Sequence, residues 1–247
     1  MIVTAIKTEK VLPKSIDLFQ FLDKYLKSLN EGSILAIASK VVALSEGRAI
    51  PVDKGNKDEL IMQEADLYLP KEENSYNLFL TITKNILAVS GGIDESNTNG
   101  YYLLWPEDSQ KTANEVREYL VKRFGLKNVG VIITDSKTTP LRWGVTGIPI
   151  AHSGFAAVRD LIGTPDIFGR KLKMTKIAVS DALAVAAVLV GGEGDEQTPL
   201  SIISEIPFVE FQDRNPTEKE LSELKIDIKD DVYAPLLKSV SWEKGKR

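Results

Sequence analysis

Several short apolar runs of this chain end directly in acidic or glycine-rich turns, and this arrangement most constrains how the chain folds. Four such stretches occur, at residues 91–97, 134–136, 180–181 and 192–196. Each adjoins a run whose composition predicts a buried strand or a helix of small residues. Carboxylates at such ends can converge on one point. A convergent set of oxygen ligands is what Mg²⁺ and Mn²⁺ require, and it indicates metal-assisted phosphate chemistry.

The composition limits the classes of function. The 247 residues carry a net charge of −4, so there is no overall basic surface for nucleic acid. The chain has no cysteine, which excludes disulfides, thiolate metal sites and thiol nucleophiles. His152 is the only histidine, so a two-histidine zinc site is excluded and a structural role is the simpler interpretation. With no signal peptide and no apolar run near the roughly 20 residues of a membrane helix, we expect a cytoplasmic protein.

The spacing of apolar residues predicts a mixture of strands and helices without a strict alternation, which favours an α+β or irregular α/β fold. Predicted strands cover residues 2–6, 33–38, 78–82, 86–90, 129–134, 172–179 and 199–206. Predicted helices cover residues 15–29 with Ser15 as N-cap, 57–69, 109–124 ending at Gly125, and 181–190 with Asp181 at its start. The polar stretch 50–76 is a candidate linker, and residues 242–247 are predicted to form a tail.

Taken together, these segments resemble the coenzyme F420:L-glutamate ligases, also called gamma-glutamyl ligases. The resemblance is carried by residues 39–42 with 46–48, 92–97, 131–136, 142–150, 160–172, 180–181 and 192–194, in that order along the chain. It holds from residue 1 to about residue 206. We therefore expect a gamma-glutamyl ligase-like domain over residues 1–206, with mixed sheets and packed helices, and a C-terminal extension of the same domain over residues 207–247.

The resemblance implies a ligase that attaches L-glutamate to the carboxylate of a deazaflavin coenzyme precursor. Such an enzyme uses GTP and two divalent ions, Mg²⁺ or Mn²⁺, and activates the carboxylate as an acyl phosphate that an amine then attacks. The family also implies an intertwined homodimer, with no nucleic-acid or membrane partner.

The matching positions imply roles for individual residues. Asp94 and Asp135 would bind one metal ion, and Ser136 and Glu193 a second. The nucleotide would contact Leu12, Pro13, Ser39, Lys40, Asn97, Gly191, Gly192 and Gly194. A substrate pocket would include Arg142, His152 and Asp181. Two cations can bridge phosphate oxygens, and glycines leave backbone N–H groups open to an anion.

The sequence departs from the family pattern at several places near these positions. The differing residues are Leu44 in place of a lysine, Ser90 in place of an asparagine, Lys137 and the three residues after it in place of a Gly-Arg turn, His152 in place of a small residue, and Ala182 in place of a glutamate. Loss of one phosphate-directed cation weakens binding by about 1–3 kcal/mol. The predicted metal ligands are kept, whereas the surroundings of the nucleotide and the acceptor are changed.

Other interpretations of the same residues stay open at this point. Asp94 also suits a turn, Asp135 and Asp181 also suit helix caps, and Glu193 also suits a solvated loop. A divergent ligase for another acid and amine would explain the departures. A nucleotide- or metal-binding protein without turnover is the alternative from a different class.

Overall fold

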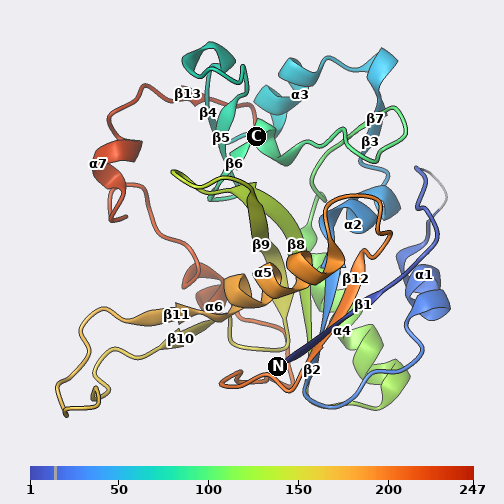
Figure 1. Cartoon of the computed structure of the whole chain (residues 1–247), viewed down its shortest axis with the longest axis vertical. Coiled ribbons are helices and arrows are strands. Elements are labelled where there is room, and N and C mark those ends of the chain that lie inside the picture. The colour runs from blue at the N-terminus through green and yellow to red at the C-terminus, as the bar shows by residue number, and fades with distance from the viewer. Residues whose placement is uncertain (14–15) are drawn as a thin grey trace.

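The computed structural model describes residues 1–13 and 16–247, and within them helices and strands are mixed along the chain as an α+β fold (Figure 1). The strands of these residues form a five-stranded sheet, a four-stranded sheet and two two-stranded sheets. We call the first two the main sheet and the second sheet. The predicted N-cap Ser15 lies outside the described residues.

The main sheet has the order β1-β12-β2-β8-β9. Its strands are β1 (Ile2–Ile6), β12 (Leu200–Ser204), β2 (Ser33–Ala38), β8 (Val129–Thr138) and β9 (Val145–Ser153). Only the β2–β8 pair within this sheet is parallel, and its last rung joins Ala38 to Thr134. Strand β8 continues beyond that rung and pairs there with β9 alone. The polar end of β8 therefore has no β2 neighbour.

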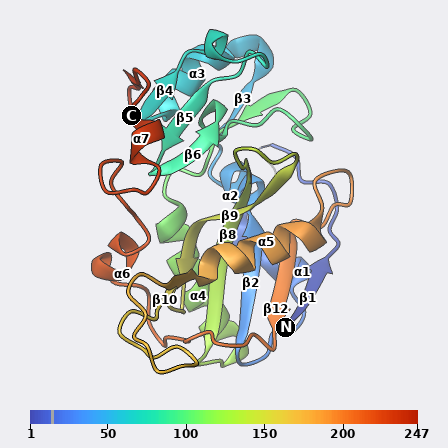
Figure 2. The same ribbon diagram turned by 60° about the vertical axis from the view of Figure 1, so that its left-hand side comes forward.

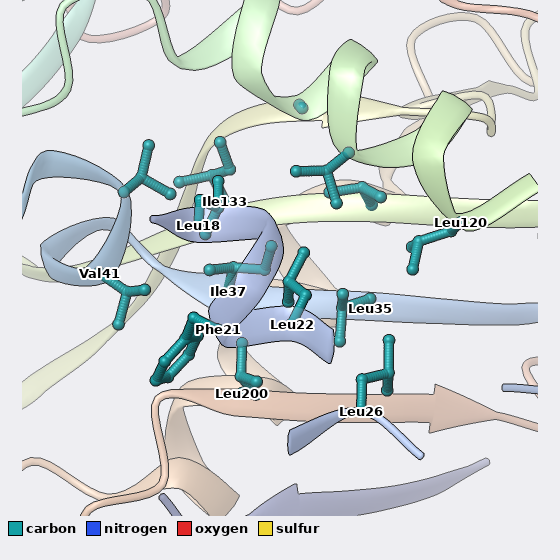
Figure 3. Packing of buried hydrophobic residues seen from close by; sticks show 14 of the residues in the cluster. Leu18, Phe21, Leu22, Leu26, Leu35, Ile37, Val41, Leu120, Ile133 and Leu200 are labelled. Atoms are coloured by element: carbon teal, nitrogen blue, oxygen red, sulfur yellow. The ribbon is translucent and has the colours of Figure 1, made fainter. Parts of the chain in front are cut away.

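Helices cover both faces of the main sheet, which explains why its central strands are apolar throughout. On one face lie α1 (Leu18–Tyr25), α2 (Ser39–Ser45) and α4 (Ser109–Phe124), and Figure 3 shows their side chains packed on those of β2, β8 and β12. On the other face lies α5 (Val179–Gly191), which packs on Ile34, Ala36 and Ile132. Successive residues of β2 thus point to opposite layers, as the period of a strand requires.

Local signals at the ends of the long helices were only partly visible in the sequence. Helix α4 begins after Asp108, whose carboxylate accepts from the Lys111 N–H, and ends at Gly125 with φ of +67°, as predicted. Helix α1 is shorter than predicted, with Asp17 as its N-cap. The prediction that Asp181 starts α5 was wrong, because the helix begins at Val179 and Asp181 lies inside its first turn.

The second sheet lies at the upper end of the molecule in the orientation of Figure 2. It has the order β13-β4-β5-β6, from β13 (Glu243–Lys244), β4 (Leu67–Leu69), β5 (Leu80–Thr83) and β6 (Ile86–Val89). Helix α3 (Lys57–Glu64) packs beside it through Leu60 and Ile61. The pair β3 (Ala49–Pro51) and β7 (Tyr101–Leu103) and the short 3₁₀ turns Val52–Lys54, Lys71–Glu73 and Ser90–Gly92 complete this part.

The predictions for two segments of this part were wrong for the same reason. The stretch 50–76 is structured rather than a linker, and its predicted helix ends at Glu64 because residues 67–69 pair with β5 as strand β4. Residues 242–247 are not a tail, since β13 pairs with the free edge of β4. Gly245 is required there, because a Cβ atom would lie 1.8 Å from the carbonyl oxygen of Ala65. Pairing between distant segments decided both outcomes.

The remaining elements are a hairpin next to the main sheet and a C-terminal segment that connects the two sheets. The hairpin of β10 (Val158–Asp160) and β11 (Lys176–Ala178) extends from the main sheet, and the predicted strand 172–179 is shortened to β11. The segment after residue 206 bridges Phe211 to Phe155, forms α6 (Glu218–Ser222) and α7 (Ala234–Leu237), and reaches β13 on the second sheet. None of the helices formed by residues 1–13 and 16–247 has the length and apolar character needed to span a membrane.

Candidate functional site

A cavity of about 450 Å³ lies where the polar end of β8 meets the loops around it. Its walls come from residues 8–12, the start of α2, residues 97 and 99, and the loop 191–199 after α5. Ten of the residues predicted from the sequence line it: Leu12, Ser39, Lys40, Asn97, Asp135, Ser136, Gly191, Gly192, Glu193 and Gly194. The four acidic stretches were predicted to converge, and three of them meet at this cavity or at its lining Lys40.

Asp135 is held by hydrogen bonds to both of its carboxylate oxygens. Oδ1 accepts from the Ser136 N–H at 2.9 Å, and Oδ2 accepts from the indole N–H of Trp105. Burial raises the pKa of Asp135 to about 6, although these hydrogen bonds and Lys40 act in the opposite direction. A cation bound in the cavity would stabilise the ionised form of the Asp135 carboxylate.

Trp105 is the functional residue that the sequence did not indicate. Its side chain is buried, and its ring lies directly against Gly92, where a Cβ atom would come within 2.2 Å of the indole. The pair Gly91 and Gly92 begins the acidic stretch of residues 91–97, and the close neighbour of Gly92 is this indole. Since Gly92 also has φ of +76°, the position excludes other residues on two grounds. The glycine pair was thus the one available signal for Trp105.

Asp94 forms an ion pair with Lys40 at the start of α2. The Lys40 Nζ lies 2.6 Å from Asp94 Oδ2, and Oδ1 accepts from the Ser96 N–H at 2.6 Å and from its hydroxyl at 2.8 Å. Burial raises the pKa of Asp94, but Lys40 and Ser96 outweigh burial and bring it below its usual range. The Asp94 backbone is fixed by hydrogen bonds to and from Leu103 of β7. Asp94 itself does not line the cavity and reaches it through Lys40.

The loop 191–199 forms the outer wall of the cavity. Asn97 donates from Nδ2 to the Gly194 carbonyl at 2.9 Å, which ties this loop to the Asp94 turn. Gly192, with φ of +78°, ends α5, and a Cβ atom there would collide with the Glu196 carboxylate, which accepts from the Gly194 N–H. Partial burial raises the pKa of Glu193, Lys40 lowers it, and Asp94 raises it further. Lys40 therefore interacts with three carboxylates of the site.

The donor set suits a hard cation, because it consists of carboxylate and hydroxyl oxygens around one lysine. In the part of the chain that the structure describes, no three acidic or histidine side chains are close enough to hold one ion by themselves. Lys40 stands among these carboxylates instead. Asp94, Asp135, Ser136 and Glu193 fit divalent ions whose remaining ligands come from phosphate or water, which is how Mg²⁺ is usually bound.

The other predicted residues lie apart from this cavity. Pro13 follows Leu12 but is not in the wall, and Arg142 is exposed in the turn between β8 and β9. Asp181 faces Ser180 in the first turn of α5. His152 is buried against Phe155, and burial lowers its pKa to about 4, so it is neutral. None of these four side chains is brought to the cavity.

Leu44 shows how one departure from the family pattern is accommodated. It lines the cavity but packs against Ala43 and Leu103, so it joins α2 to β7 through an apolar contact. A lysine side chain is therefore replaced by packing between the two parts of the molecule.

Comparison with known proteins agrees with this geometry. The family model of F420-0:gamma-glutamyl ligase matches residues 5–205. A coenzyme F420:L-glutamate ligase of Methanopyrus kandleri is 37% identical over 192 residues, covering 70% of this chain and 75% of that protein. Proteins of the same name from Methanococcus maripaludis and Methanocaldococcus jannaschii are 35% and 32% identical, covering 87% and 79% of this chain and 90% and 84% of their own lengths. The chain therefore belongs to the F420-0:gamma-glutamyl ligase family and is a ligase.

Proposed function

We propose that this chain is a GTP- and divalent-metal-dependent ligase that joins the amine of L-glutamate to a carboxylate of a deazaflavin coenzyme precursor. The observation that carries the proposal is the position of Lys40, which pairs with Asp94 and lines the large cavity together with Asp135 and Glu193. A ligand bound there meets oxygen donors for cations and a lysine for phosphate. The names of the relatives give coenzyme F420 and L-glutamate, and the precursor follows from the resemblance in the sequence.

The cavity suits a nucleotide in size and in chemistry. Its volume of about 450 Å³ lies in the usual range of small-molecule sites, roughly 300–1,000 Å³. The loop with Gly191, Gly192 and Gly194 would lie over the phosphates. Because the Gly194 N–H donates to Glu196 and the Gly192 N–H to the Val188 carbonyl, these groups would reach the phosphates only after those bonds are released. Ser39 and Lys40 would contact the nucleotide from the start of α2, Asn97 from beside the loop to which it is hydrogen-bonded, and Leu12 from the segment that precedes α1. Bound phosphates would replace Asp94 as the partner of the Lys40 ammonium group. The Asp94 carboxylate would then be released from its ion pair.

Two divalent cations would be held by pairs of residues, Asp94 with Asp135 and Ser136 with Glu193. Such ions neutralise phosphate charge and bridge phosphate oxygens when bound. The chain's own part is to hold these oxygen donors in place. The hydrogen bonds from Trp105 and the Ser136 N–H fix the plane of the Asp135 carboxylate, and the backbone bonds to Leu103 fix Asp94. The phosphorylated carboxylate would then lie at the polar end of β8, open to attack by the amine.

Calorimetric titration of GTP and of ATP in the presence of Mn²⁺ tests this proposal. We expect GTP to bind only with the metal, and Asp94→Asn to reduce its affinity at least about tenfold, because one carboxylate charge facing the cation is lost. Glu95→Gln is the matched control, since Glu95 is the next residue and pairs with Lys57 instead. Metal-dependent GTP affinity that is equal in both variants and the wild type would contradict the proposed site.

The ligase step has its own measurement. Incorporation of labelled L-glutamate into the deazaflavin precursor should require both GTP and metal. Binding of GTP without any incorporation would favour the alternative of a nucleotide-binding protein without turnover. Incorporation into a different acid would favour a divergent ligase, which the apolar Leu44 in the cavity wall supports.

We also propose that a second copy of this chain completes a homodimer. Large apolar side chains are strongly exposed at the ends of two long hairpins, with Leu141 and Trp143 at 103% and 93% of full exposure, and Ile167 and Phe168 at 92% and 88%. Exposed apolar groups of this size favour burial against a partner. Sedimentation equilibrium should give a dimer, and Trp143→Asp should shift it toward monomer. A monomer at all concentrations would contradict the dimer.

A further inference from the structure

A second, smaller cavity of about 120 Å³ adjoins the candidate site, and the loop 191–199 takes no part in its wall. It lies between β6, β8 and β9, and Gly92 and Trp105 form part of its wall. Ser136 borders both cavities. The polar end of β8 therefore separates a space large enough for a nucleotide from one suited to a much smaller molecule.

The charges of the two cavities differ in sign. The large cavity has the five carboxylates of Glu9, Asp135, Glu193, Asp195 and Glu196 in its wall against two lysines, Lys10 and Lys40, so its net charge is negative. Among the described residues, no acidic side chain lines the small cavity. The one charged residue of the small cavity's described lining is Lys137, which is half-buried and forms no ion pair or hydrogen bond through its side chain with any described residue. Its other walls are mainly apolar, from residues such as Ile86, Val89 and Ile148. One lysine among apolar walls favours the binding of a small organic anion.

The strand geometry places Lys137 relative to the reacting centre. Residues 135 and 137 are two positions apart in β8 and pair regularly with 148 and 146 of β9, beyond the register shift at residues 133 and 134. Side chains two positions apart lie on the same face of a strand, roughly 7 Å from each other. The Lys137 side chain thus lies on the same face as Asp135, about the length of a small amino acid away. Trp105 agrees with this placement, because it contacts Asp135 and also lines the small cavity.

We propose that the small cavity binds the amino-acid substrate, with Lys137 pairing with one of its carboxylates and its amine directed toward the Asp135 end of β8. This inference rests on the proposed ligase function. The carboxylate that becomes activated loses its charge when phosphorylated and lies beside the cations. A carboxylate that does not react stays anionic throughout, so it needs a permanent counter-ion such as Lys137.

The test is calorimetric titration of L-glutamate into protein that already holds Mg²⁺ and guanosine 5′-(β,γ-imido)triphosphate. Lys137→Met should raise the Kd for L-glutamate at least about tenfold, because a charge-assisted contact is lost. Lys137→Arg, which keeps the cation, should restore most of the affinity. Lys122→Met on the exposed surface of α4 is the matched control and should change nothing.

The same experiment separates this inference from the function on which it rests. The Kd of the GTP analogue should be equal in the wild type and in Lys137→Met. If the analogue binds but the L-glutamate affinity is unchanged in Lys137→Met, the inference is overturned while the nucleotide site stands. Titration with the deazaflavin precursor distinguishes the other source of a carboxylate. A loss of precursor affinity without a loss of L-glutamate affinity would assign Lys137 to the acid that is activated, and would also overturn the inference.

Discussion

The main sheet and the second sheet are held in place by different kinds of contact. The main sheet is buried on both faces, and residues such as Leu35, Ile37 and Ile133 are fully enclosed by apolar side chains. The second sheet has a smaller apolar core around Leu60 and Ile61. Apolar packing is non-directional and tolerates exchanges of similar volume, so the main sheet should be the robust part of the molecule.

Between the two sheets, charged side chains carry many of the contacts. Arg48 donates from Nε to the Trp105 carbonyl at 3.0 Å, and its guanidinium pairs with Glu64 at 2.7 Å and with Glu107 at 3.0 Å. Lys84 donates to the carbonyls of residues 106 and 107, and burial lowers its pKa. These contacts are directional and depend on single residues. The position of the second sheet should therefore change after single substitutions that leave the main sheet folded.

The candidate site includes residues from both parts. Asp135, Ser136 and Lys40 belong to the main sheet and α2, whereas Asp94 and Trp105 come from the chain around the second sheet. The main sheet and its loops supply the cavity. We expect the charged contacts between the two sheets to set the distance between Asp94 and Asp135. Substitutions at those contacts should alter the site before they alter global stability.

Gly92→Ala should produce the largest effect. A Cβ atom there meets the Trp105 ring at 2.2–2.7 Å and also sits at positive φ, so we expect a loss of about 2–5 kcal/mol from strain and overpacking. The indole should then leave Asp135. Urea unfolding measures the stability, and tryptophan fluorescence during Mn²⁺ titration measures the change at the site.

Gly100→Ala is the matched control for this comparison. Gly100 also has a positive φ, of +86°, but nothing lies within 4 Å of its added Cβ atom. We expect only the backbone cost, about 1–2 kcal/mol, and an unchanged Mn²⁺ titration. Equal effects of the two substitutions would mean that the contact between Gly92 and Trp105 does not position the site.

Much of the main sheet could be predicted from the sequence. The apolar runs at residues 33–38 and 129–134 are strands because both faces are covered, and α4 follows from its periodic pattern and Gly125. These signals are local, since they come from neighbours in the chain. The metal, cofactor and nucleotide assignments came from the resemblance and stay predictions, as do the domain limits at residue 206.

The second sheet and the details of the site could not be predicted in this way. Strand β13 forms only because a free edge of β4 is available, and the tail itself has no strand pattern. The Trp105–Asp135 contact joins residues 30 positions apart, and no periodicity indicates it. The same is true of the Lys40–Asp94 ion pair, which depends on how the two sheets meet. Local patterns thus predicted the part that packing holds, and failed where single directional contacts decide.

His152→Phe tests the main sheet through pH, with a smaller effect. Burial lowers the pKa of His152 from 6.5 to about 4, so the unfolded chain binds its proton at a higher pH than the folded chain does. The contribution of His152 to stability is therefore complete above pH 6.5 and is lost as the pH falls toward 4, by up to about 3 kcal/mol. Urea unfolding at pH 7 and pH 4.5 measures it.

The difference between wild type and variant isolates this histidine from Asp135. Burial raises the pKa of Asp135 to about 6, so its protonation in the folded state increases stability as the pH falls from 6 toward 3.8. That opposing contribution is present in both proteins and cancels in the comparison. A variant that loses as much stability between pH 7 and pH 4.5 as the wild type would show that His152 is not held neutral by burial.

Arg48→Lys should give the smallest effect, and it tests the directional contacts most directly. One ammonium group cannot replace a planar guanidinium that serves Glu64, Glu107 and the Trp105 carbonyl together. Since the ammonium keeps part of these contacts, we expect a loss of about 0.5–1.5 kcal/mol, the net range of one hydrogen bond. Because the loss concerns the second sheet, amide hydrogen exchange should become faster in β4, β5 and β6 and stay unchanged in β2 and β8.

Arg123→Lys is the corresponding substitution within the main part. Arg123 on α4 donates to the carbonyls of Leu22 and Leu26 and pairs with Asp23, so it secures the end of α1. Its loss should speed exchange in α1 and leave the second sheet as it is. If Arg48→Lys instead speeds exchange equally in both sheets, the two sheets unfold as one cooperative unit. The directional contacts between them would then stabilise the whole fold rather than the position of Asp94 and Trp105 against Asp135.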